Sequence, residues 1–431
     1  MKRLWKWHSV ISLYVGVVII ILSVSGSLVV FKQEIDQWLN PHLYYITPAS
    51  SISDDLDTFI NAQLGEYQQL KSYSLDIPED KEQSWCLSVY LNREGQPAEN
   101  LEIFIDPYKA KVLGVRSKYH STAFFLRTLH IRLFEDYYGR QWVGLAGVLM
   151  VVNLVIGGIL YFPFSKRQRF GEVRKKNSRL LFGDLHKFIG LSTLVFHLLI
   201  AITGAWLGFQ PIIQKKILHQ RPGDWQPSVM RTNPQEDLFT PIAFHAVLEK
   251  ARTLKPDWED FKIQPSINGA GTVTVLANIK GAVFEHQTNA IWLDKESLEC
   301  LHQLDLREEN FLRKLYYWQE GLHFGHFGGW PLKILYAAVG LIGGFLGVSG
   351  FVVYVKRQKK SWWSSKADLK MVLFSLLSLA LGLVLWGFTR VYGVHWTLRG
   401  SSYLFYFFLV IPFLIPAWPR ISSYIEKLKR S

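Results

Sequence analysis

The chain has 431 residues, of which 49% are hydrophobic, 15% aromatic and only 19% charged. Its apolar residues gather in six blocks of about 20 residues, the length that a helix needs to cross about 30 Å of hydrocarbon. This pattern argues against a soluble enzyme and predicts an integral membrane protein. The two cysteines, Cys86 and Cys300, exclude a disulfide scaffold, a Cys-ligated zinc or iron–sulfur centre and covalent haem attachment through C-x-x-C-H.

The first apolar block, within residues 1–31, follows a basic N-terminal start. We expect an uncleaved anchor, because the block is too long for a signal peptide and no small-residue cleavage site follows it. The remaining spans are predicted at residues 140–162, 184–209, 331–355, 371–389 and 402–419. The predicted fold is therefore an all-α bundle of six transmembrane helices.

Basic residues mark two of the connecting loops. Loop 163–183 holds seven Lys and Arg against Glu172, and loop 356–370 holds six against Asp368. The positive-inside rule places these loops, the N-terminus and the tail 420–431 in the cytoplasm. The net charge of +13 is thus mainly an orientation signal, and a nucleic-acid partner is not expected.

This topology leaves two long segments, 32–139 and 210–330, and the short loop 390–401 on the outer side. Residues 101–107 and 272–276 alternate like strands, and Ile242–Leu254 has the apolar spacing of a helix. We expect two small α+β domains.

The chain contains an internal duplication. With His8 placed over His186, the first and third spans align without a gap, and the segments before the second and fourth spans align with His130 over His323. The unit of helix, outer domain and helix is used twice, and spans five and six follow as a C-terminal hairpin. Because both copies enter the membrane in the same direction, an axis along the membrane normal relates them.

Several motifs resemble those of PepSY-associated transmembrane proteins over about residues 5–358. They are the His-x-x-x-x-Leu that opens spans one and three, the Ser/Thr-Gly near their outer ends, Leu129-His130, and Leu322-His323-Phe324-Gly325 before Phe327-Gly328-Gly329. Ile103-Phe104-Ile105-Asp106-Pro107 with Val112-Leu113-Gly114 resembles the closing hairpin of a PepSY domain, and Ile291–Asp294 is a weaker second copy. The resemblance implies a multi-pass protein of the bacterial inner membrane, with two PepSY-like domains in the periplasm. In the best understood members it implies a haem-containing reductase of ferric siderophores.

The inner pair of histidines, His8 and His186, lies at the cytoplasmic start of two equivalent spans. A polar ring is inexpensive there, so packing at the interface or a quinone-binding role remains an alternative. The duplication keeps an imidazole at the same depth in both copies, and two facing imidazoles are what a low-spin b-type haem needs. We predict that His8 and His186 ligate haem iron.

An outer haem is predicted between His130 and His323. The alternative is that these two residues are polar caps where the chain enters the bilayer. His326 is a reserve ligand without a counterpart in the first copy. His197 follows His186 by eleven residues, about 16.5 Å and about three turns of a continuous helix, so both rings would share one face. His197 is then either an outer ligand paired with His323 or a buried polar residue. One or two haem b groups, with two favoured, are expected.

Other features carry less information. The glycines at 340, 343, 344, 347 and 350 form a bare stripe that suits either close helix packing or a porphyrin face. The remaining histidines of the outer segments, His286 among them, are interpreted as ordinary surface or fold residues.

No G-x-G-x-x-G after a strand, no P-loop and no H-E-x-x-H occurs, so electrons would come from a quinol or a separate cytoplasmic flavoprotein. The leading prediction is an oxidoreductase that passes electrons through haem to a periplasmic ferric siderophore and releases Fe(II). The alternative is a non-redox membrane protein, either a transporter of iron or siderophore or a scaffold whose outer domains bind another protein.

Overall fold

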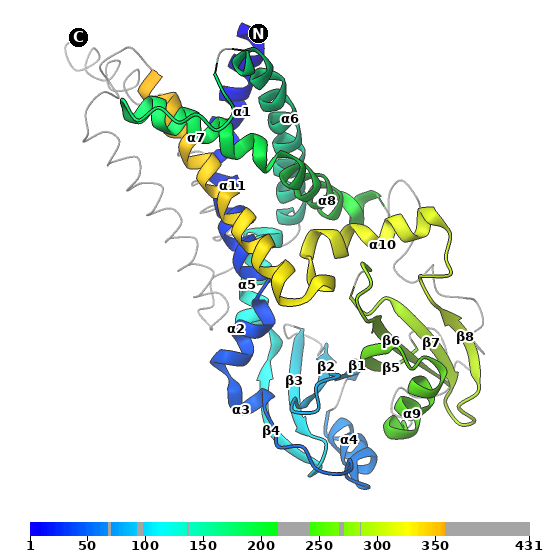
Figure 1. Cartoon of the computed structure of the whole chain (residues 1–431). Helices are drawn as coiled ribbons and strands as arrows, with labels where there is room; N and C mark the ends of the chain where they lie inside the picture. The colour runs from blue at the N-terminus through cyan, green and yellow to red at the C-terminus, as the bar shows by residue number, and fades with distance from the viewer. Residues whose placement is uncertain are drawn as a thin grey trace, which may run out of the picture. The chain divides into compact units, whose positions relative to one another are not determined.

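A computed structural model describes residues 1–67, 70–92, 98–135, 138–166, 168–213, 241–266, 271–284 and 286–357. The predicted spans five and six, loop 390–401 and the tail 420–431 lie outside the described residues. The chain forms two compact units. The helix unit contains Met1–Val30, Phe125–Pro211 and the chain from Ile334, and the sheet unit contains Phe31–Phe124 and Ile212–Lys333 (Figure 1).

Four helices of the described residues are long and apolar enough to cross a membrane. They are α1 (Lys2–Val29), α6 (Gly139–Ser165), α8 (Leu194–Ile212) and α11 (Gly329–Arg357). Each contains most of one of the first four predicted spans. The helix unit also holds α7 (Ser178–Ser192) and most of α5 (Thr122–Arg132), the latter predicted as part of the first outer domain.

The third span is interrupted, whereas the sequence predicted one continuous helix over 184–209. Helix α7 ends at Ser192, and α8 begins after Thr193, whose φ of −106° and ψ of 7° leave the helical region. The hydroxyls of Ser192 and Thr193 donate to the carbonyls of Phe188 and Ile189 at 2.9 and 2.8 Å. Two consecutive hydroxyls that bond back by four residues bend a helix, which explains the interruption. His186 and His197 therefore lie on different helices, and the predicted shared face is wrong.

Small residues allow the helices to approach closely. Helix α1 packs along α6. Where α6 meets α8, a Cβ atom on Gly208 would lie 2.4 Å from the Cα atom of Gly144, so only glycine fits. Arg140 Nε donates to the carbonyl of Leu207 at 2.8 Å and joins the same two helices.

The sheet unit contains one antiparallel sheet of eight strands in the order β4-β3-β2-β1-β5-β6-β7-β8. The first outer segment supplies β1 (Leu70–Ile77), β2 (Trp85–Leu91), β3 (Glu99–Asp106) and β4 (Lys111–Ser117). The second supplies β5 (Trp258–Pro265), β6 (Thr272–Ile279), β7 (Asn289–Asp294) and β8 (Cys300–Leu304). Shorter helices α2 (Lys32–Leu39), α3 (Pro41–Tyr44) and α10 (Phe311–Phe324) belong to the same unit.

The two halves join where β1 pairs with β5, for example Leu75 with Ile263. The sequence predicted two separate domains over 32–139 and 210–330, and the structure instead gives them one sheet. Each half alone would expose the unpaired backbone groups of β1 or β5 at one edge, and pairing β1 with β5 covers these two edges, which leaves β4 and β8 as the edge strands.

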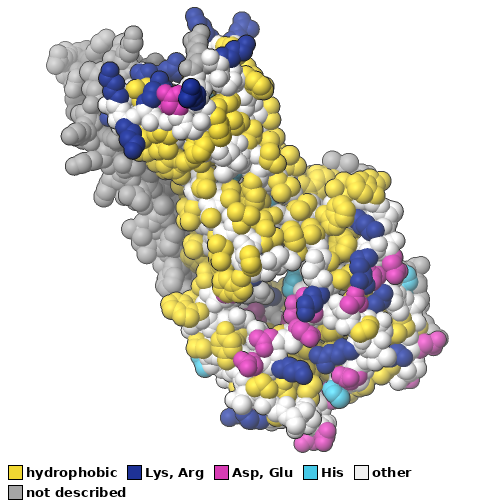
Figure 2. Space-filling model, in the orientation of Figure 1, with side chains coloured by type: hydrophobic (Ala, Val, Ile, Leu, Met, Phe, Trp, Pro, Cys, Tyr) yellow, Lys and Arg dark blue, Asp and Glu magenta, His cyan; other side chains and the backbone are white. Residues whose placement is uncertain are grey.

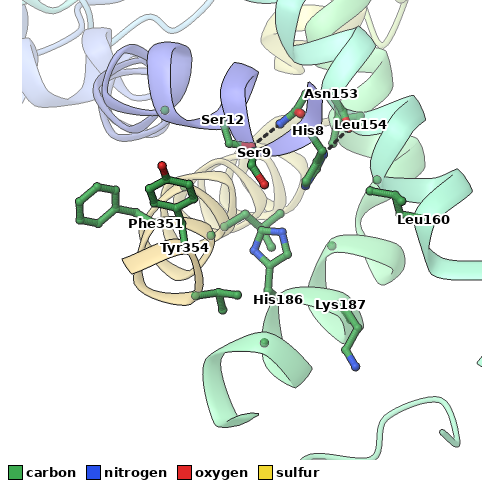
Figure 3. Close-up of a pocket in the computed structure, with 18 of the residues that line it drawn as sticks. His8, Ser9, Ser12, Asn153, Leu154, Leu160, His186, Lys187, Phe351 and Tyr354 are labelled. Carbon is green, nitrogen blue, oxygen red and sulfur yellow. Dashed lines mark hydrogen bonds between the residues drawn. The ribbon is translucent and has the colours of Figure 1, made fainter. Parts of the chain in front are cut away.

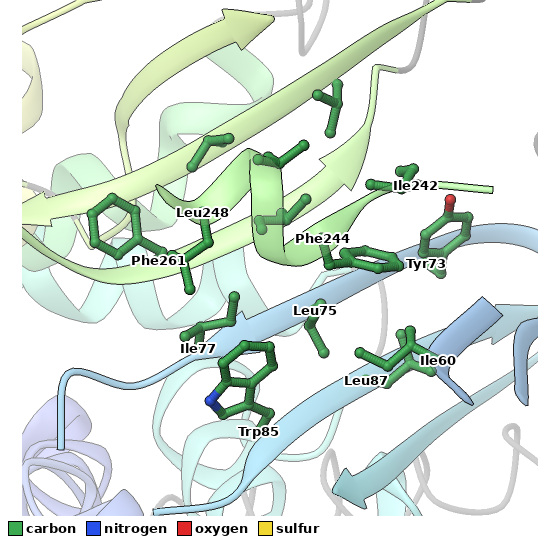
Figure 4. Packing of buried hydrophobic residues seen from close by; sticks show 14 of the residues in the cluster. Ile60, Tyr73, Leu75, Ile77, Trp85, Leu87, Ile242, Phe244, Leu248 and Phe261 are labelled. Atoms are coloured by element: carbon green, nitrogen blue, oxygen red, sulfur yellow. The ribbon is translucent and has the colours of Figure 1, made fainter. Parts of the chain in front are cut away.

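One hydrophobic core serves both halves. Helices α4 (Leu56–Gly65) and α9 (Phe244–Leu254) contribute Ile60 and Phe244 to a cluster that also contains Leu75 and Leu87 (Figure 4). Asn61 binds the backbone of Ile242 in both directions, at 3.0 and 3.1 Å. The predicted helical pattern of Ile242–Leu254 is confirmed, because its apolar side faces this core.

Candidate functional site

A cavity of about 470 Å³ lies inside the helix unit, between α1, α6, α7 and α11 (Figure 3). Ile, Leu, Val and aromatic side chains form much of its wall. Eight of the lining residues are glycines: Gly16, Gly157, Gly158, Gly183, Gly190, Gly343, Gly347 and Gly350. Such a wall exposes flat backbone surface, which suits a large planar ligand.

The imidazoles of His8 and His186 lie side by side in the wall of this cavity. Their ring centres are 6.4 Å apart and their planes are inclined at 76°. His8 comes from α1 and His186 from α7, and Figure 3 shows both rings at the cavity. The structure thus brings together the pair that the duplication singled out.

Hydrogen bonds determine which nitrogen of each ring remains available. His8 Nδ1 donates to the carbonyl of Asn153 at 3.2 Å. His186 Nδ1 lies 2.9 Å from Ser349 Oγ, which itself donates to the carbonyl of Leu346 at 3.1 Å and therefore accepts from the ring. With the proton on Nδ1, each neutral ring has its lone pair on Nε2. Metal-binding histidines are commonly oriented in this way by a second hydrogen bond.

Each of these rings rests on a glycine of the neighbouring helix. A Cβ atom on Gly157 would lie 3.3 Å from His8 Cε1, and one on Gly350 would lie 3.3 Å from His186 Cε1. These glycines follow Asn153 and Leu346, whose carbonyls face the two rings, by four residues. The same arrangement therefore occurs once in each copy of the duplicated unit.

His130 has a similar contact but is placed differently. Its ring lies on α1, where a Cβ atom on Gly26 would be 2.9 Å from Cε1, and its Nδ1 is 3.1 Å from Ser25 Oγ. It does not line the cavity. His130 belongs to the helix unit and His323 to the sheet unit, so their pairing as haem ligands stays a prediction.

His197 is only 3% exposed and contacts α11. Its Nδ1 donates to the carbonyl of Thr193 at 3.0 Å, and among the described residues its Nε2 makes no hydrogen bond of regular geometry, although the ring lies near the backbone of Val339. A Cβ atom on Gly343 would lie 3.0 Å from Nε2, so α11 leaves no room for a porphyrin at that position. Ligation of haem by His197 would require α11 to move.

The structure adds one contact that sequence spacing did not indicate. His326, the reserve ligand, stacks on Phe324 at 5.5 Å, and its ring centre is 6.1 Å from that of His286. His323 meets the edge of Phe324 instead. Because 40 residues separate His286 from His326, no local pattern could pair them. Within the described part of the chain, no three His, Cys, Asp or Glu side chains are grouped as a metal site.

One end of the helix unit, which we call the basic end, carries the N-terminus, loop 166–177 and the end of α11. Lys and Arg gather there, beyond a hydrophobic surface on the helices (Figure 2). Asp184 is 3% exposed and binds Arg174 Nε at 2.8 Å and Lys187 Nζ at 2.9 Å. These ion pairs fasten loop 166–177 to α7 at the mouth of the cavity.

A search of curated proteins found no match. A family model described as the PepSY-associated TM region matches residues 5–357, which is most of the chain. This match confirms the resemblance expected from the motifs. With four apolar helices of membrane-spanning length, the protein is a multi-pass membrane protein, and it belongs to the family of the PepSY-associated TM region.

Proposed function

We propose that this protein is a haem-dependent electron conduit that reduces a ferric siderophore across the bacterial inner membrane. One observation carries the proposal: two imidazoles from equivalent positions of the duplicated sequence share a glycine-lined cavity, and each ring is held through Nδ1. His8 and His186 would hold a haem b in this cavity, each through its Nε2.

The dimensions of the site fit this group. Two metal–nitrogen bonds of about 2 Å and two nitrogen-to-centre distances of about 1 Å put ligand rings about 6 Å apart. The observed separation of the ring centres is 6.4 Å. The cavity of about 470 Å³ falls within the range of about 300–1,000 Å³ typical of cofactor pockets.

The residues of the chain have distinct tasks in this proposal. Asn153 and Ser349 fix the tautomer and direction of the two rings, and the apolar wall keeps water from the cofactor. When bound, haem supplies one-electron chemistry whose potential depends on its axial ligands and its burial. Ferric iron held by the siderophore is the substrate, and its reduction weakens a hard-oxygen chelate.

The orientation follows from charge. The positive-inside rule assigns the basic end to the cytoplasm, where a flavoprotein or a membrane quinol would donate electrons. The sheet unit would then be periplasmic. An outer haem held by His130, His323 or His197 remains a prediction, for which the closed contacts of His130 and His197 offer no support.

The test is a haem assay on the full chain purified from haem-replete cells, with visible spectra before and after dithionite. We expect at least one low-spin haem per chain, and loss of that signal in His8→Ala and His186→Ala. His245→Ala is the control, because His245 is exposed and lies on α9. A colourless wild-type preparation would favour the non-redox alternative of a transporter or scaffold.

Activity needs a second assay. With the protein in vesicles that enclose a reductant, a ferric siderophore outside should yield Fe(II), trapped by a coloured chelator. His186→Ala should abolish this reduction, while His245→Ala should leave it unchanged. Equal rates in all three proteins would contradict the proposal even if haem were present.

A further inference from the structure

Charge is distributed unevenly around the cavity. Its inner wall is apolar, whereas its charged lining residues lie towards the basic end. Four of these are cations and one is a carboxylate: Arg174, Arg179, Lys187, Arg357 and Asp184. A ligand that satisfies both regions must be amphipathic, with an anionic part towards the basic end.

Two of the four cations already have an ionic partner. Arg174 and Lys187 both bind Asp184, and Lys187 also donates to Gln168 Oε1 at 2.6 Å. The single carboxylate is therefore used by these two residues, and they serve to hold loop 166–177.

Arg179 and Arg357 form no ion pair with any described carboxylate. Arg357 is held in place by Trp5, over whose ring its guanidinium lies at 4.7 Å from the centre. Stacking on an aromatic face leaves the in-plane N–H donors of a guanidinium available. Arg179, near the start of α7, lines the same mouth. The cavity thus offers two guanidinium groups to its ligand.

We propose that Arg179 and Arg357 bind the two propionate carboxylates of the haem, and so orient it with its propionates towards the basic end. This inference rests on the proposed function. Guanidinium and carboxylate groups match in shape and can form paired charge-assisted hydrogen bonds. Two carboxylates at one edge of an otherwise apolar macrocycle correspond to two arginines at one end of an otherwise apolar cavity.

The test compares haem b with its dimethyl ester, which has the same ring and iron but no propionate charge. Both are titrated into the full chain purified from haem-deficient cells. We expect the wild type to prefer the diacid, and Arg179→Gln and Arg357→Gln each to weaken its binding by about tenfold to a hundredfold. Ester binding should change little. The double variant should bind diacid and ester equally.

Matched controls lie beside both arginines. Lys176→Gln removes a charge three residues before Arg179 and Lys356→Gln removes one next to Arg357, but neither lysine lines the cavity. Both should behave like the wild type. The midpoint potential gives a second readout, since loss of a nearby cation disfavours the added electron and should lower it in the arginine variants alone.

The outcomes separate the two proposals. If the wild type binds neither compound, the proposed function fails and this inference fails with it. If it binds diacid and ester equally, or if the lysine controls lose as much affinity as the arginine variants, haem binding stands and propionate recognition is wrong. If phosphatidylglycerol displaces haem from the wild type but not from the double variant, the arginines recognise lipid phosphate, which also overturns the inference.

Discussion

The two compact units bury polar groups in opposite ways. In the sheet unit, Asp36 accepts hydrogen bonds from Arg116 and Tyr44, both at 2.5 Å, so its carboxylate is fully engaged. In the helix unit, His8 and His186 each use Nδ1 and keep Nε2 for the cavity. Buried polar groups that are fully satisfied fix a fold, whereas a half-satisfied group beside a cavity is available to a ligand.

Removing the engaged carboxylate should have the largest effect on stability. Asp36→Ala leaves the largely buried guanidinium of Arg116 with Glu102, at 2.9 Å, as its one ionic partner among the described residues. We expect the free energy of unfolding of the sheet unit to fall by about 3 kcal/mol. Denaturant unfolding should show this loss, with an unchanged haem spectrum. Asp54→Ala, at an exposed position, is the control, and a haem defect in Asp36→Ala would break the distinction between the units.

Gly26 and Gly157 provide the next test. Each lies against a histidine ring, but only the ring beside Gly157 borders the cavity. Gly26→Ala would place Cβ at 2.9 Å from His130 Cε1 in a closed contact, and should destabilise the helix unit by about 1–3 kcal/mol. Gly157→Ala meets His8 at 3.3 Å beside a cavity into which the ring can tilt. It should lower haem affinity more than stability. Thermal unfolding and haem titration of both variants test this difference. A larger loss of stability in Gly157→Ala, together with a larger loss of haem affinity in Gly26→Ala, would contradict our interpretation.

A smaller, pH-dependent effect is expected at Asp305 in the sheet unit. Burial alone would raise the pKa of this carboxyl, but hydrogen bonds from Arg307 and Lys255 outweigh it and hold the pKa well below its usual value. The stabilisation is therefore present above about pH 4 and is lost as the pH falls through the lowered pKa.

Asp305→Asn should make the stability of the sheet unit less dependent on pH below about pH 4. Unfolding midpoints measured from pH 6 downwards would show this. Asp54→Asn should retain the wild-type slope, and an identical slope in Asp305→Asn would assign acid sensitivity to other carboxylates.

The smallest effect is expected at His197, whose ring uses one nitrogen in a regular hydrogen bond and does not line the cavity. His197→Leu keeps a similar volume and removes a nitrogen that makes no regular hydrogen bond, so stability should change by less than about 1.5 kcal/mol. His186→Leu should lose the low-spin haem. Loss of a haem from His197→Leu as well would show that His197 is a ligand and that α11 moves to admit a porphyrin.

Hydropathy and periodicity located the first, second and fourth spans within a few residues, most of the third span, and the helix within Ile242–Leu254, because both are local properties of the chain. The sequence also determined that His8 and His186 are equivalent, since a duplication preserves depth in the membrane.

Tertiary structure alone decided the features that depend on contacts between distant residues. The pairing of β1 with β5 merged two expected domains into one sheet. Successive back-bonding hydroxyls at Ser192 and Thr193 separated His186 from His197. Helix packing decided which rings meet the cavity and which are closed, although a glycine faces each of them, because the space beside a ring is set by all the helices around it rather than by the sequence next to it.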